Sequence, residues 1–124
     1  MRGVCVVLVR KGLRDYCLSK KAAKAEFPFG PEAEVFKVMG KMFALIPTDA
    51  SPPSISLKCD PVLAEMLRQT YTAVKPGYHM NKRHWNTVMS DGSIPDDELL
   101  EMIDNSYALV VKGLTKADRE RLLK

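Results

Sequence analysis

The 124-residue sequence predicts one α+β domain, in which helices pack on one face of an antiparallel sheet. Strand-like runs form a block near the middle of the chain, and stretches with helical periodicity flank that block. Hydrophobic residues make up 46% of the chain and charged residues 27%, as in globular domains, so a disordered or fibrous chain is excluded. The formal charge of +4 is compatible with an anionic partner.

The start of the chain differs from the rest, so we read residues 1–12 as an atypical extension and residues 13–124 as the domain. The apolar run Gly3–Val9 is far shorter than the roughly 18 to 20 residues that span a membrane. Arg10 and Lys11 follow it directly, without the small residues of a signal-peptide cleavage site. The three cysteines are an odd number and have no CxxC spacing, which favours a reducing compartment. We therefore expect a cytoplasmic protein.

The first elements are a helix and a hairpin. A helix is predicted from Leu13 to Ala25, and the proline-rich stretch 27–31 ends it. Two apolar runs follow, Glu34–Met39 and Met42–Ile46, with Gly40-Lys41 between them. A two-residue link with glycine first predicts a hairpin with a type II′ turn.

A third strand and a second helix come next. Residues Ser54–Cys59 alternate between apolar and polar side chains, which predicts a half-buried strand that completes a meander. Asp60 and Pro61 are a helix start, with a carboxylate at the N-cap and proline at the first helical position. The helix is expected to run to about Tyr71, with a core-facing side made of Val62, Leu63, Met66, Leu67, Thr70 and Tyr71.

The last third of the chain predicts one more strand and two helices. Residues Trp85–Ser90 form the strand, which a turn at Asp91-Gly92 closes. Acidic residues at 96–98 mark the first turn of a helix whose apolar residues step by three and four. Gly113 is expected to end that helix, and Thr115 to cap a short final helix.

The segment Val74–Val88 carries the functional prediction, because cations and aromatic rings alternate along it. Such a mixture suits contact with phosphates together with base stacking. Turns at Pro76-Gly77 and at a tip near Asn81-Lys82 would make it a β-wing. The predicted nucleic-acid-binding residues are Lys75, Tyr78, His79, Asn81, Lys82, Arg83, His84 and Trp85. For Trp85 alone, packing between sheet and helices is the favoured interpretation.

Five blocks resemble the MmcQ/YjbR family of small bacterial proteins in the same order. They are RDYCLSKKAA, FPFGPEAEVFKVMGKMFALI, ISLKCDP, VKPGYHMNKRHWNTV and DGSIPDDELLEMIDNSY. The resemblance covers the chain from about Leu13 onward. It implies a CyaY-like α+β fold and DNA binding through a double-wing motif. We expect a monomer. The residues that match the family in the wing are Lys75, Tyr78, His79, Asn81, Lys82, His84 and Trp85.

Other functions are weighed against this one. A small anionic ligand or a peptide, held by the sheet beside the loop, is the second hypothesis. An enzyme is the third, because the sequence has no GxSxG, P-loop or GxGxxG motif, and no cofactor is expected. His79 and His84 are five residues apart, which does not favour a shared metal ion. A frataxin-like iron role needs an acidic first helix, whereas Lys20, Lys21 and Lys24 make the predicted one basic. The cysteines are interpreted as small core residues, namely Cys5, Cys17 and Cys59.

Overall fold

The computed structural model describes residues 10–28, 30–48, 53–77 and 84–123. Most of the predicted N-terminal extension lies outside these residues, and residues 10–12 belong to the first helix. The elements in chain order are α1 (Arg10–Leu18), β1 (Ala23–Glu26), β2 (Ala33–Val38), β3 (Lys41–Pro47), β4 (Ser54–Lys58), α2 (Pro61–Thr70), β5 (Val74–Pro76), β6 (Trp85–Met89), α3 (Asp96–Lys112) and α4 (Lys116–Leu123).

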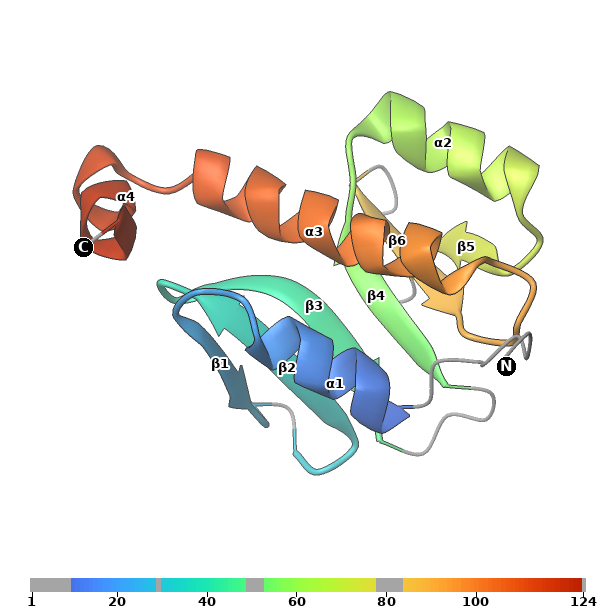
Figure 1. The fold of residues 1–124 in the computed structure, drawn as a ribbon, viewed down its shortest axis with the longest axis horizontal. Coiled ribbons are helices and arrows are strands. Elements are labelled where there is room, and N and C mark those ends of the chain that lie inside the picture. The colour runs from blue at the N-terminus through green and yellow to red at the C-terminus, as the bar shows by residue number, and fades with distance from the viewer. Residues whose placement is uncertain (1–9, 29, 49–52, 78–83, 124) are drawn as a thin grey trace.

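The strands form one antiparallel sheet of six strands in the order β1-β2-β3-β4-β6-β5. Helices α1 and α3 lie across the same face of this sheet, and α2 sits over the β5–β6 end (Figure 1). The predicted α+β architecture is therefore confirmed. Apolar side chains between the sheet and these helices make the core, including Leu13, Phe36, Ile55, Leu99 and Ile103.

The first helix is shorter than predicted, and its second half is a strand. Helix α1 ends at Leu18, and Ala22 takes a left-handed backbone conformation with φ 61° that reverses the chain. Strand β1 then pairs with β2, with Ala23 opposite Val38. The helix-favouring sequence AKAE is thus overridden by pairing with a sheet edge, because tertiary contacts outweigh local propensity. Lys20, Lys21 and Lys24, which were assigned to the helix, all follow it.

The predicted β2–β3 hairpin is present, but its turn is one residue earlier. Met39 and Gly40 are the central residues, and both have positive φ, 50° and 82°. Two left-handed residues make a type I′ turn, so the predicted type II′ turn at Gly40-Lys41 is wrong. Glycine adopts this conformation freely, whereas Met39 pays a steric penalty for it.

A bulge interrupts the pairing of the same two strands. The register changes between Phe36 and Lys37, where β3 has Phe43 as one extra residue. The bulge directs the fully buried Phe43 ring toward α3, where it meets the edge of the Tyr107 ring at a centroid distance of 5.3 Å.

A serine of α3 bridges β3 and β4 at this bulge. If the register were extended by one residue beyond Ala44 and Leu57, Phe43 would pair with Lys58. The Ser106 hydroxyl lies there instead: it accepts the N–H of Lys58 at 2.9 Å and donates to the Phe43 carbonyl at 2.5 Å. This fully buried hydroxyl replaces a hydrogen bond between strands and attaches α3 to both of them.

Strand β4 is buried on both faces, so the half-buried strand of the prediction is wrong. It lies inside the sheet between β3 and β6, and Ser54 and Ser56 are only 8% and 5% exposed. The Ser56 hydroxyl is 2.9 Å from that of Thr87 on β6, so its polar atom is satisfied by a neighbouring strand.

Helix α2 begins as predicted, because the Asp60 carboxylate accepts the N–H groups of Val62 and Leu63. Its predicted core-facing side is only partly correct, because Leu67 and Tyr71 pack against the core while the other members of that side are exposed. Ala64 is its buried residue, and the apolar residues Val62, Leu63 and Met66 are exposed. The helix lies over the β5–β6 end of the sheet (Figure 1).

The C-terminal helices agree with the sequence. Helix α3 buries Leu99, Ile103 and Val110, and Gly113 forms its C-cap. The Thr115 hydroxyl accepts the N–H of Asp118 at 3.2 Å and so caps α4. Within the described residues, no helix is long and apolar enough to cross a membrane.

Candidate nucleic-acid interface

The two arms of the predicted wing are paired strands. Strands β5 and β6 run antiparallel, and the pairing continues past β5, where the N–H of Gly77 donates to the carbonyl of Trp85 at 2.8 Å. The predicted turn at Pro76-Gly77 is therefore wrong. Pro76 fits an edge strand because the ladder there does not require its missing N–H. Five predicted site residues lie outside the described residues: Tyr78, His79, Asn81, Lys82 and Arg83.

Glycine is required at position 77 by the close approach of the two arms. A Cβ atom built on Gly77 would lie 2.8 Å from the Trp85 Cβ and 3.1 Å from its carbonyl oxygen. Both obstacles are close to or part of the backbone, so they cannot turn aside as a flexible side-chain end would. This contact fixes the separation of the arms where they enter the segment 78–83.

Trp85 lies on the sheet face that points away from the helices. Its neighbour Asn86 faces α2, and successive side chains of a strand point to opposite faces. Trp85 is half-buried and lies outside the core, so the interpretation as a plug between sheet and helices is wrong. His84 precedes it, also half-buried, and its carbonyl accepts the N–H of Cys59 at 2.7 Å. Lys75 is exposed on the neighbouring edge strand.

The register of the whole sheet shows which other side chains share this face with Trp85. Lys58 is opposite Trp85, Lys75 is opposite Thr87, and Lys24 is opposite Lys37. We call this surface the outer face and define it by its strand residues Lys24, Glu26, Ala33, Val35, Lys37, Met42, Leu45, Pro47, Ser54, Ser56, Lys58, Lys75, Trp85, Thr87 and Met89. Its charged members are four lysines and one glutamate, and that glutamate contacts Lys37 at 3.5 Å.

A buried polar contact holds the wing arm to α2. Arg68 donates from Nε to the Asn86 side-chain oxygen at 2.7 Å, and Asn86 donates to the Ala64 carbonyl at 3.3 Å. Asn86 is only 2% exposed. Sequence reasoning missed both Arg68 and Asn86. The available signal was an amide at a core-facing position of the strand WNTVM, where an apolar residue is expected.

Comparison with known proteins identifies the family. The family model described as YjbR matches residues 18–109. The chain belongs to the YjbR family. It is 45% identical to the Escherichia coli O157:H7 protein YbdF over 96 residues, which are 77% of this chain and 79% of YbdF. It is 38% identical to YjbR of Escherichia coli K12 over 111 residues, 90% of this chain and 94% of YjbR.

A solved structure agrees with this assignment. The crystal structure of a Deinococcus radiodurans protein is similar with a TM-score of 0.86 and 42% identity. The similarity covers 94% of this chain and 88% of that protein. The resemblance found in the sequence is thus confirmed at the level of the family and of the fold.

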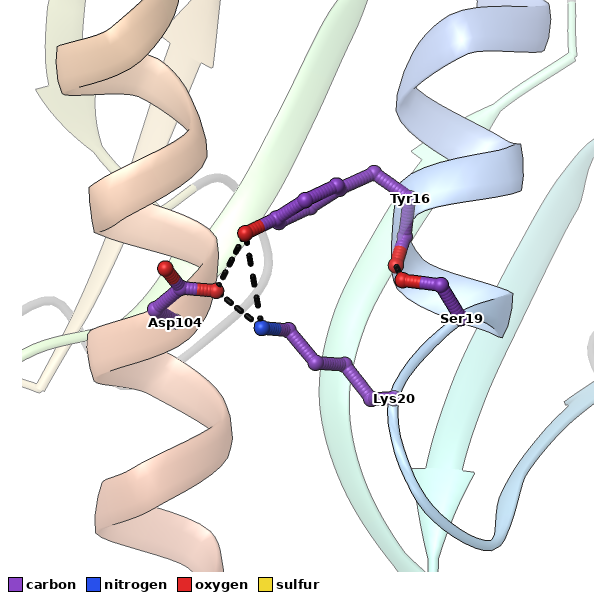
Figure 2. A network of polar contacts seen from close by, with 4 residues as sticks. All are labelled: Tyr16, Ser19, Lys20 and Asp104. Atoms are coloured by element: carbon purple, nitrogen blue, oxygen red, sulfur yellow. Dashed lines mark hydrogen bonds and ion pairs between the residues drawn. The ribbon is translucent and has the colours of Figure 1, made fainter.

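In this YjbR-family chain, Lys20 is not free to bind a polyanion. Figure 2 shows that the Tyr16 ring and the Lys20 side chain both reach Asp104 on α3. The Tyr16 hydroxyl donates to the Asp104 carboxylate at 2.7 Å, and Lys20 forms an ion pair with the same oxygen. The Lys20 ammonium also lies 4.7 Å from the Tyr16 ring centroid, in a cation–π contact. The network ties the end of α1 to the middle of α3.

The protonation states of the network follow from its geometry. The hydrogen bond to Asp104, together with burial, raises the pKa of Tyr16. Burial favours the neutral forms of Lys20 and Asp104, but their mutual contacts and Tyr16 outweigh it. The pKa of Lys20 is therefore raised and that of Asp104 lowered, so both groups are charged at neutral pH.

The two described cysteines are core residues, as expected. Burial raises the pKa of Cys17 to about 12 and also raises that of Cys59, so both thiols are protonated at neutral pH. Cys5 lies outside the described residues. Among the residues that the structure describes, no three His, Cys, Asp or Glu side chains cluster as a metal site.

A wide hollow of about 640 Å³ near the other end of the sheet is the described feature most relevant to a small anion. Its cation is Arg14, whose Nε donates to both carboxylate oxygens of the buried Glu34 at 3.0 Å. Because this carboxylate already compensates the guanidinium charge, the hollow does not favour an anionic ligand.

Proposed function

We propose that this YjbR-family protein binds duplex DNA as a monomer, mainly through the DNA phosphates. The observation that carries the proposal is the charge of the outer face, where lysines outnumber acidic residues four to one. Phosphate contacts of this kind supply affinity without sequence preference. The partly exposed Trp85 ring on the same face is suited to stacking against a base or a sugar.

The positions of the lysines support a polyanionic partner. Lys24 and Lys37 are directly opposite each other on neighbouring strands, an arrangement of like charges that costs stability. The contact of Glu26 with Lys37 at 3.5 Å offsets part of that repulsion, and an anion bound above the two lysines would reduce the rest. Lys75 lies on the other edge of the six-stranded sheet, about 24 Å away at a strand spacing of about 4.8 Å. The lysines lie around the buried outer-face residues Val35, Ser54 and Ser56, toward both edges of the sheet. That spread suits contacts with an extended polyanion rather than with a single small anion.

The segment 78–83 is proposed to extend this surface. Lys82 and Arg83 would contact the backbone, and His79 and Asn81 would reach base edges. Tyr78 would brace the wing or stack. The paired arms Val74–Gly77 and His84–Met89 support this assignment, because they hold the two ends of the segment together beside Lys75.

The test is a titration of the protein with a short fluorescein-labelled duplex over a series of salt concentrations. Anisotropy reports binding, and fluorescence of Trp85, the single tryptophan, reports contact with the outer face. If four cations engage phosphates, log K falls against log salt with a slope of about −3.6. Absence of binding by the folded protein at low salt, or a flat salt dependence, refutes the proposal.

Two charge-reversal variants and a matched control locate the site. Lys58→Glu/Lys75→Glu tests the outer face and Lys82→Glu/Arg83→Glu tests the wing segment. Lys112→Glu/Lys116→Glu makes the same change of charge at exposed positions in and after α3. We expect the first two to weaken binding at least tenfold and the control to weaken it much less. Equal losses in all three would mean that only net charge matters, and that outcome contradicts a defined interface.

A further inference from the structure

A groove between α2 and α3 has an apolar floor and an acidic rim. Leu63 and Leu67 of α2 and Met102 of α3 line it, and its volume is about 260 Å³. Tyr71, Glu98 and Glu101 form its border, and Glu98 accepts a hydrogen bond from the Tyr71 hydroxyl. None of the described residues that line the groove is basic. Figure 1 shows the two helices that enclose it, on the side of the sheet opposite the outer face.

Helix α2, beside this groove, exposes large apolar side chains to solvent, and their exposure does not stabilise the helix. Val62 is 70% exposed, Met66 is 58% exposed, and Leu63 at the groove is 37% exposed. Val62 and Met66 are four residues apart, so they lie one turn apart on the same side of α2. Such a continuous apolar ridge next to a groove is typical of a surface that binds another protein.

The acidic rim distinguishes between two possible occupants of the groove, a second copy of this chain and a basic segment of another protein. A second copy of this chain, packed α2 against α2 about a twofold axis, would bring Glu98 and Glu101 toward the same acidic residues of its partner. A segment with lysines or arginines beside its apolar residues would instead be attracted by the rim. Spacing of anchors at i, i+3 and i+4 would fit the ridge and the groove together.

We infer that the α2–α3 groove docks a basic amphipathic helix of another protein. Apolar side chains of that helix would pack on Val62, Leu63 and Met66, and its cations would face Glu98 and Glu101. The groove contains no residue of the outer face, so this partner and a nucleic acid can be bound together. The inference does not depend on the proposed function.

The test uses a synthetic 14-residue peptide with leucines at i, i+3 and i+4 spacing and lysines elsewhere. Its acidic twin has glutamate in place of every lysine. We expect binding of the basic peptide, followed by anisotropy of a terminal label, to be at least tenfold tighter than binding of the twin. Equal binding of the two peptides overturns the inference, as does no binding of the basic peptide at about 0.2 mM protein, which would mean a binding free energy weaker than about −5 kcal/mol.

Two variants of exposed residues assign the binding to the groove. Val62→Ser/Met66→Ser removes apolar anchors, and Glu98→Gln/Glu101→Gln removes charge while keeping an acceptor for Tyr71. Both should weaken binding of the basic peptide at least fivefold while the protein stays folded. Loss of the Glu98 charge from the first turn of α3 should lower the melting temperature only slightly. Phe27→Ser, at an exposed aromatic residue elsewhere, is the matched control and should not weaken it. Unchanged binding of the basic peptide in both groove variants overturns the inference. It is also overturned if the wild-type protein sediments as a dimer and Val62→Ser/Met66→Ser makes it a monomer.

Discussion

Replacing Ser106 by alanine should destabilise the fold more than the loss of one oxygen atom suggests. The hydroxyl is fully buried and bonds both the N–H of Lys58 and the carbonyl of Phe43. A buried backbone group left without a partner costs about 1–3 kcal/mol, while the better helix propensity of alanine returns about 0.5 kcal/mol. Two such groups lose their partner, so we expect the free energy of unfolding to fall by about 1.5–5.5 kcal/mol.

Urea denaturation followed by far-UV circular dichroism measures this loss. For a chain of this length it corresponds to a melting temperature lower by about 6–20 °C. Amide exchange gives a local readout, because the N–H of Lys58 should lose protection more than its neighbours in β4. The control is Asn105→Ala, at the exposed adjacent position of α3, which should change stability by less than about 0.5 kcal/mol. A loss in Ser106→Ala as small as in this control, with unchanged exchange at Lys58, would refute the bridging role.

Three further predictions concern the wing and the helix contacts. Gly77→Ala should lower the free energy of unfolding in urea by about 1–3 kcal/mol and shift the emission of Trp85. Gly113→Ala should lower it much less, because a Cβ atom there would make ordinary contacts. Asn86→Ala should lower the free energy of unfolding by about 1–3 kcal/mol and speed amide exchange in α2. Unchanged exchange there would contradict the role of Asn86 in holding β6 to α2. Because its pKa is lowered on folding, Asp104 stabilises the protein above its ordinary pKa of 3.8 and loses that effect as pH falls. The stability lost in Asp104→Asn should therefore be larger at pH 7 than at pH 3, and equal losses at both would contradict the ion pair.

Elements whose ends are fixed by local chemistry were predictable from the sequence. The Asp60-Pro61 start of α2 and the Gly113 end of α3 depend on hydrogen bonds between residues a few positions apart. The apolar spacing of α3 was equally informative, because a helix lying across the middle of a sheet buries one continuous side. These features need no knowledge of the rest of the fold.

Features that depend on distant partners were not predictable in the same way. The sequence AKAE of β1 becomes a strand only because the edge of β2 is available to it. The left-handed conformation of Met39 is unfavourable locally and is held by the hairpin on either side. The exposure of Val62 and Met66 depends on where α2 packs on the rest of the fold, which no periodicity in that helix reveals.

The candidate site was found in part. The mixture of cations and rings located the wing arms, and Trp85 lies beside Lys75 on one surface. The wider outer face was missed, because it unites lysines from strands far apart in the chain. Lys58 was on the polar side of a predicted strand, whereas Lys24 had been assigned to a helix. Only the register brings them onto the same side of one sheet.

The strand order has a consequence for how the molecule folds and opens. Strands β1 to β4 are neighbours both in the chain and in the sheet, so each pairing closes a short connection. Pairing of β6 with β4 must first close the segment 59–84, which costs more chain entropy. The β5–β6 arms are thus expected to join the sheet late and to open first, as a separate cooperative unit. A nucleic acid bound to these arms would slow amide exchange in β5 and β6 before it affected β2 and β3.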